Sequence, residues 1–375
     1  MAHNDIYCGL CGAALSIPLF SATDAPDEGG PGHGRPGVED MQWLEDVRML
    51  YQNTHHNTNF EMSVRVRNDN ANLSSIVTRR DDGRWNRTGY VPTGDEFENT
   101  SPDAFKDFSP YMEGRYHIIP LHDACNKLLA KFLNYSVGTT PENYLRVLFE
   151  TLRSFHDTSS DFYTGKIKYG KISKQHGQFW YPTLTTKAFV YDPFFTSPEL
   201  KRYYDNLPEI EKDGEQKDDF AVCYMKPTSK PDPFRKLPAE LLMMILMHLP
   251  AQSIRQLKLA STTIAKLRLP VSFWKQKLKR DMPWLWDFPG QGTEPTRKNL
   301  DWLQIYKDIY IGSKGNGKAP FFNLANRNRI WRISEQIAPR FMKCQEEWEI
   351  SQERKRERLL AMIREGEMRL WPRLD

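Results

Sequence analysis

The stretch that decides the fold of this chain reads PFRKLPAELLMMILMHLPAQSIRQLKLASTTIAKLRLPVSFW and covers residues 233–274. Pro238 suits the first turn of a helix, where a missing N–H costs nothing, and Pro250 ends the same helix. Four apolar side chains between the two prolines follow the i, i+3, i+4, i+7 spacing of one helix face: Leu242, Ile245, Leu246 and Leu249.

Two further helical segments follow in the same stretch. Ser253 is a suitable N-cap for a second helix that carries Ile254. A third segment around Ile264 leads into the aromatic pair at 273–274. The pattern therefore predicts a module of three short helices over residues 232–278.

The order LPxELLxxILxxLP, then LxLAS, then FW resembles the F-box, and the resemblance covers about an eighth of the chain. The flanking DPF at 232–234 and the LPxSFW run resemble the F-box proteins of filamentous fungi. The resemblance implies that the module binds a small Skp-type adaptor. The adaptor would join the chain to a cullin-RING ubiquitin ligase, while the rest of the chain binds an unknown target protein.

The expected adaptor-binding residues are the apolar residues of the box: Leu237, Pro238, Leu241, Leu242, Ile245, Leu249, Leu257 and Trp274. Some of them must form internal core and others must make the contact. Met243, Met244 and Met247 depart from the usual pattern and should soften the packing without abolishing it. Two alternatives remain open: the leucines only form the core of a helical hairpin, or the chain is an F-box scaffold that recruits no substrate for ubiquitination.

Composition limits the partners and the compartment. The 375 residues include 52 basic and 48 acidic ones, a net charge of +4, which predicts neither a nucleic-acid nor a membrane partner. No apolar run reaches the roughly 20 residues of a membrane span, and the start of the chain lacks the basic region of a signal peptide. Five sparse cysteines favour a reducing compartment. We expect an intracellular protein of the cytoplasm, the nucleus or both.

The expected fold class is α+β and helix-rich, with an N-terminal α+β domain, the three-helix module and a helical C-terminal region. The boundaries follow shifts in composition: a Cys-containing knuckle at 1–20, a Gly/Pro-rich linker at 21–39, a target-binding or scaffold domain at 40–208, a charged linker at 209–231, the F-box at 232–278 and the helical region at 279–375.

Inside these regions the hydrophobic pattern predicts individual elements. We expect a helix over 41–52 with Trp43, Val47 and Leu50 on one face, and strands at 61–67, 73–79 and 115–122. We expect further helices at 123–133, at 139–155 with Thr140 as N-cap, at 299–310, and from about Arg329, where Pro339 should kink or interrupt the helix.

Two pairs of metal-ligand residues share the same spacing. Cys8 and Cys11 resemble a zinc knuckle in which Gly12 lets backbone amides turn toward sulfur, and His122 and Cys125 lie at a probable strand-to-helix junction. Together they would make a Cys3His set for one structural zinc. The alternatives are free thiols at 8 and 11 with a small core residue at 125, or a redox CxxC pair.

Other motifs point away from catalysis. GSKGNGK at 312–318 fits the spacing of a P-loop, but Ala319 follows in place of the magnesium-binding hydroxyl, so no nucleotide is expected. The chain contains no GxSxG motif, and the spacing of the remaining histidines, among them His55, His56, His117, His156 and His176, matches no helical i, i+4 ligand pair. The ERKRER run at 353–358 is most simply a solvated helix face. We therefore expect no catalytic residues and no enzyme activity.

Overall fold

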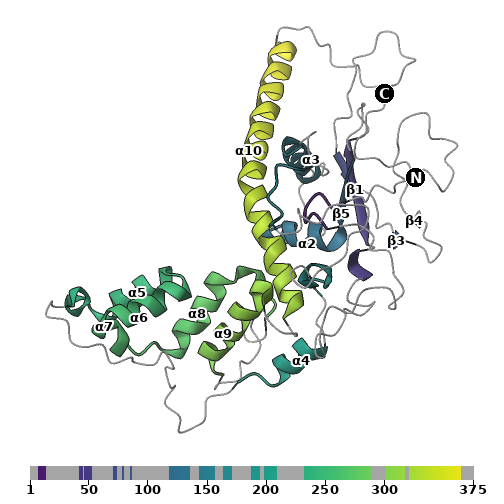
Figure 1. Ribbon diagram of the computed structural model, residues 1–375. Helices are drawn as coiled ribbons and strands as arrows, with labels where there is room; N and C mark the ends of the chain where they lie inside the picture. Colours follow the sequence, from purple (N-terminus) through teal and green to yellow (C-terminus); the bar gives the residue numbers. More distant parts are fainter. Residues whose placement is uncertain are drawn as a thin grey trace, which may run out of the picture. The chain divides into compact units, whose positions relative to one another are not determined.

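In the residues that it describes, the computed structural model (Figure 1) is helix-rich with two small sheets, as the predicted α+β class requires. Two compact units divide the chain: residues 1–195 together with 329–375, and residues 196–328. The structure describes the following residues: 7–13, 42–44, 46–52, 71–73, 78–79, 85–86, 118–135, 143–156, 164–170, 187–194, 198–208, 232–288, 300–316 and 321–364. The predicted linkers at 21–39 and 209–231 lie outside these residues.

The first unit is built on an antiparallel sheet in the order β2-β1-β5. Leu50 of β1 lies opposite Leu73 on one side and Ile119 on the other, so β1 is the central strand. The elements are the 3-10 turns η1 (Gln42–Leu44) and η5 (Lys187–Val190), the strands β1 (Val47–Gln52), β2 (Ala71–Leu73) and β5 (Ile118–His122), the paired strands β3 (Thr78–Arg79) and β4 (Trp85–Asn86), and the helices α2 (Asp123–Phe132) and α3 (Tyr144–Ser154).

The predicted helix over 41–52 is wrong: the described residues of this range include η1 at 42–44 and β1 at 47–52 and no α-helix. Trp43, Val47 and Leu50 are buried as expected, but for a different reason. Side chains alternate along a strand, so Val47 and Leu50 point to opposite faces of the sheet. Because β1 is buried on both faces, its apolar residues mimic the spacing of a helix.

The predicted strand-to-helix junction is confirmed, since β5 ends at His122 and α2 begins at Asp123. The helix predicted at 139–155 is present as α3, with Asn143 in the N-cap position. Thr140, the predicted cap, lies outside the described residues, as does the strand predicted at 61–67. Of the strand predicted at 73–79, the described residues belong to β2 and β3.

The long helix α10 (Phe322–Arg364) begins seven residues before the predicted start and runs through Pro339 without interruption. Pro339 is exposed, so the carbonyl that loses its helical partner can be hydrated. Within the first unit α10 lies beside α2 and α3 (Figure 1), where Trp331 meets the ring of Phe132 and Arg340 donates to Ser154 Oγ at 3.1 Å.

The regular elements of the second unit, within its described residues, are all helices. Its elements are α4 (Pro198–Asp205), η6 (Pro233–Lys236), α5 (Ala239–His248), α6 (Ala251–Ala260), α7 (Thr262–Lys266), α8 (Val271–Asp281), η7 (Pro283–Leu285), α9 (Trp302–Ile311) and the π turn η8 (Gly312–Asn316), followed by the first residues of α10. The helix α9 falls where the pattern at 299–310 predicted one.

Residues 232–278 thus hold four α-helices and not three, because α7 and α8 are separate. Ser253, the predicted N-cap, lies inside α6, and Pro250 occupies the N-cap position. Pro238 and Pro270 do the same for α5 and α8. Each proline has an extended ψ and occupies a position where its missing N–H is not needed, so it starts the next helix, while the preceding helices have their C-caps at Leu237, Leu249 and Leu267.

Lys277 joins α8 to the end of α5. Its side chain is 1% exposed, and its Nζ donates to the carbonyls of Met247 at 2.9 Å and Leu249 at 2.6 Å. The carboxylate of Asp281 lies 2.9 Å from the same nitrogen and neutralises it. A buried lysine is tolerated here because it satisfies carbonyls that the end of α5 leaves without helical partners.

Candidate metal centre and helical module surface

The first half of the candidate metal centre is a tight turn at residues 8–13. Cys8 N donates to the Ala13 carbonyl at 2.9 Å, and Gly12 N donates to the Cys8 carbonyl at 2.8 Å. Gly12 has φ of 70°, and a Cβ on it would lie 2.8 Å from the ring of Tyr169. Both the backbone conformation and the close ring therefore require glycine at this position.

The second half is the junction between β5 and α2. The helix is anchored at its start, since Asp123 N donates to the Asp46 carbonyl at 2.8 Å. The Asp123 carboxylate pairs with Arg48 and, at 2.6 Å, with Lys127. These contacts fix His122 at the end of the strand and Cys125 in the first turn of the helix, three residues apart.

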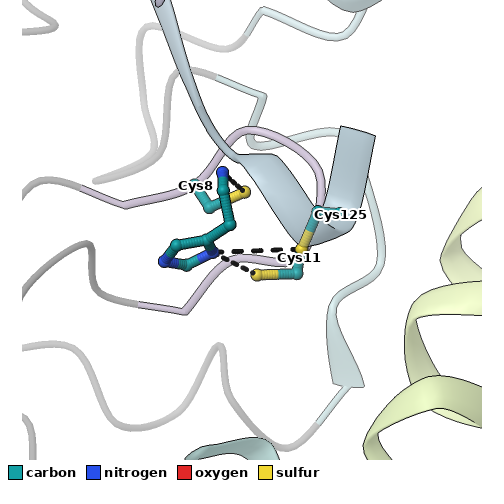
Figure 2. A group of neighbouring side chains, drawn as sticks. Cys8, Cys11 and Cys125 are labelled. Carbon is teal, nitrogen blue, oxygen red and sulfur yellow. Dashed lines mark hydrogen bonds between the residues drawn. The ribbon is translucent and has the colours of Figure 1, made fainter. Parts of the chain in front are cut away.

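The two halves meet, as their matching spacing predicted. One ligand atom from each of Cys8, Cys11, His122 and Cys125 can be chosen so that all lie within 4.8 Å of one another. His122 Nδ1 is 3.3 Å from Cys11 Sγ and 3.9 Å from Cys125 Sγ. Figure 2 shows the three cysteine side chains converging on one point. All four residues are fully buried, so the prediction that they gather in one place is confirmed.

Charge and burial set the protonation of the cluster. Burial alone would raise the pKa of Cys11, but hydrogen bonds with Cys125 and Cys8 and the charge of His122 hold it well below its ordinary value. Burial would lower the pKa of His122, yet the charges of Cys8 and Cys11 raise it to about 10. Burial raises the pKa of Cys125 well above its ordinary value.

This arrangement can hold a metal ion. Ligands placed around a tetrahedral ion at about 2.0 to 2.3 Å lie roughly 3.5 to 3.8 Å from one another, close to the separations in the cluster. Backbone N–H groups also point at two sulfurs: His122 N lies 3.3 Å from Cys8 Sγ and Ala13 N lies 3.4 Å from Cys11 Sγ. Such donors stabilise thiolates, the form of cysteine that binds metals. Nδ1 of His122 is the nitrogen that faces the sulfurs.

Side chains around the cysteine turn donate hydrogen bonds to its backbone carbonyls, and no sequence motif predicted these contacts. Thr164 Oγ1 and Tyr169 OH donate to the Gly9 carbonyl at 3.1 Å and 2.9 Å. Arg329 of α10 donates to the Cys11 carbonyl at 2.6 Å. These residues lie more than 150 positions from the turn, so their pairing follows from the tertiary fold and has no local signal.

The predicted adaptor-binding residues of α5 separate into two faces. Leu242 and Leu246 are 3% and 0% exposed and belong to the core. The opposite face, here called the α5 outer face, holds side chains that are 37%, 46%, 61% and 39% exposed: Leu237, Leu241, Met244 and Ile245. At 100° per residue, Leu241, Met244 and Ile245 fall within one sector of α5, away from Leu242 and Leu246. Leu237 lies just before the helix, where it is the C-cap of η6.

The other predicted residues also divide between core and surface. Trp274 is buried and lies 5.5 Å from the ring of Tyr306. Leu249 and Leu257 are half-buried, and Pro238 is exposed at the start of α5. The expectation that some members of the set are core and others are surface therefore fits their burial, with Leu242 and Trp274 on the core side.

Hydrogen bonds of Asp232 connect the beginning of the helical module to its third helix, α7. Its carboxylate accepts from Thr263 N at 2.9 Å, from Ser261 Oγ at 2.7 Å and from Phe234 N at 3.0 Å. These hydrogen bonds, the one from Thr263 N first, hold the pKa of Asp232 well below its ordinary value. Ser261 in turn caps α7 by accepting from Ile264 N at 3.1 Å. The caps explain why a five-residue helix is stable at this place.

Comparisons with protein-family models, with curated proteins and with solved structures gave no match for this chain. Among the described residues, no helix is both long and apolar enough to cross a membrane.

Proposed function

We propose that this chain is a non-catalytic F-box receptor whose α5 outer face binds a Skp-type adaptor of a cullin-RING ubiquitin ligase. The observation that carries the proposal is the exposure of Leu237, Leu241, Met244 and Ile245 beside a well-formed core. A short helix that, with the residue before its N-cap, keeps four large apolar side chains in water is typical of a partner-binding surface. Leu237, Leu241 and Ile245 are fixed positions of the LPxELLxxIL pattern that resembles the F-box, and Met244 occupies one of its variable positions.

The test is direct binding of the purified full-length chain to a purified Skp-type adaptor, measured by calorimetry. Truncation of a central anchor typically costs on the order of 2 kcal/mol or more, which is about thirtyfold in affinity. Leu237→Ala combined with Leu241→Ala should therefore bind at least about thirtyfold more weakly. Leu359→Ala in the exposed part of α10 is the matched control, since it removes a leucine that is equally exposed, at 46%. Undiminished binding by the double variant would remove the proposal.

We also propose that Cys8, Cys11, His122 and Cys125 hold one structural zinc ion. Three thiolates and one imidazole are a standard structural zinc set, and four protein ligands leave no open position for a reacting water. The ion would join the N-terminal turn to the β5–α2 junction across more than 100 residues of chain. Elemental analysis of protein purified without chelator should give one zinc per chain, and far less than one would contradict the assignment.

A further inference from the structure

The α5 outer face lies in a strongly basic part of the chain. Residues 232–288 contain ten lysines and arginines against four aspartates and glutamates, whereas the whole chain has a net charge of only +4. Three of the four acidic residues are engaged internally: Asp232 as a cap, Asp281 with Lys277, and Asp287 with Arg327. Glu240 is the remaining one and lies at the edge of the face.

Basic side chains stand at both ends of this face. At the N-terminal end, Arg235 and Lys236 are exposed immediately before Leu237. At the C-terminal end, His248 continues the face one turn after Met244 and Ile245, and Arg280 of α8 reaches it, with Nη2 lying 2.6 Å from His248 Nδ1. The helix between the two ends spans ten residues, or about 15 Å.

We propose that the α5 outer face docks into an apolar groove of a protein partner that carries carboxylates at both ends of the groove. The inference rests on the proposed function and adds the chemistry of the partner: an acidic adaptor surface. Apolar contact with the four exposed side chains would supply affinity, and the flanking charges would orient the helix and speed its association. A second copy of the chain fits less well, because basic groups at both ends of the helix would face each other in either orientation.

The test measures association rates of the full-length chain with a purified Skp-type adaptor at about 0.1 M and about 1 M salt, where the Debye length falls from about 10 Å to about 3 Å. Lys236→Glu combined with Arg280→Glu should slow association about tenfold or more at the lower salt, and the difference should largely vanish at the higher salt. Lys279→Glu is the matched control, because it reverses an exposed charge next to Arg280 and should change the rate by less than about twofold.

The outcomes separate the two proposals. Equal rates for the charge-reversed and wild-type chains at both salts, with binding still lost in Leu237→Ala combined with Leu241→Ala, would overturn the acidic groove and keep the adaptor proposal. Absence of adaptor binding by the wild-type chain would overturn both. Self-association of the chain that Leu241→Ala abolishes would assign the face to a second copy and would also overturn the acidic groove.

Discussion

The candidate metal centre and the α5 outer face place their chemically distinctive side chains in opposite environments. The three thiols and the imidazole of the cluster are fully buried, and the backbone N–H groups of His122 and Ala13 donate to two of the sulfurs. The four large apolar side chains of the α5 outer face are exposed to water, although Leu242 and Leu246 on the other side of the helix are buried. Burial of polar ligands without an open position is typical of a structural site, whereas exposure of apolar groups is typical of a binding surface.

The largest effect should come from removing metal ligands. Cys8→Ser combined with Cys11→Ser should reduce bound zinc from one per chain to nearly none and unfold the turn at 8–13, because structural sites contribute roughly 10 to 16 kcal/mol of apparent binding free energy. Elemental analysis and hydrogen exchange would measure both effects. Cys344→Ser is the control, since Cys344 is a buried free thiol outside the cluster and its loss should leave the zinc content unchanged.

The second prediction separates the two faces of α5. Leu246→Ala should lower the free energy of unfolding by about 2 to 5 kcal/mol, because Leu246 is fully buried. Leu241→Ala should change it by less than about 0.5 kcal/mol while weakening adaptor binding. Denaturant unfolding and calorimetry would test the pair. Similar losses of stability for both variants would show that the outer face is part of a core.

The third prediction concerns the backbone of the cysteine turn. Gly12→Ala should destabilise the metal centre by about 1 to 3 kcal/mol, because a side chain at φ of 70° is strained and its Cβ would meet the Tyr169 ring. Competition with a chelator would report the weaker metal affinity. Gly170→Ala is a matched control: Gly170 has a φ of 74° but open space around its Cβ position, so it shares the strain without the clash. Equal effects of the two changes would assign the loss to strain alone.

The smallest effect should come from Asp232. Hydrogen bonds hold the pKa of Asp232 in the folded chain below its ordinary value of about 3.9. The contribution of Asp232 to folding stability is therefore fully present above about pH 3.9 and is lost as the pH falls toward the folded pKa. Asp232→Ala should cost about 1 kcal/mol at neutral pH, the usual value of a lost cap, and nearly nothing in strong acid. Hydrogen exchange of the α7 amides as a function of pH would measure this difference, and a cost independent of pH would contradict it.

The local parts of both sites could be predicted from the sequence, and the distant parts could not. Equal spacing of Cys8 with Cys11 and of His122 with Cys125 was enough to predict their meeting. The leucine pattern predicted a helix at α5 but could not tell that Leu241 is exposed and Leu242 is buried. Both are leucines of the same helix, and which of them is buried depends on the side that the rest of the fold covers. Arg329 and Tyr169 support the cysteine turn through tertiary contacts that leave no pattern in the sequence.

The α5 outer face can be tested residue by residue with methyl NMR of the full-length chain titrated with a Skp-type adaptor. If this face binds the adaptor, the methyl signals of Leu237, Leu241, Met244 and Ile245 should shift or broaden most, while those of Leu242 and Leu246 in the core should respond far less. Uniform small changes, or the largest changes at residues outside 237–248, would contradict the claim that this face binds the adaptor.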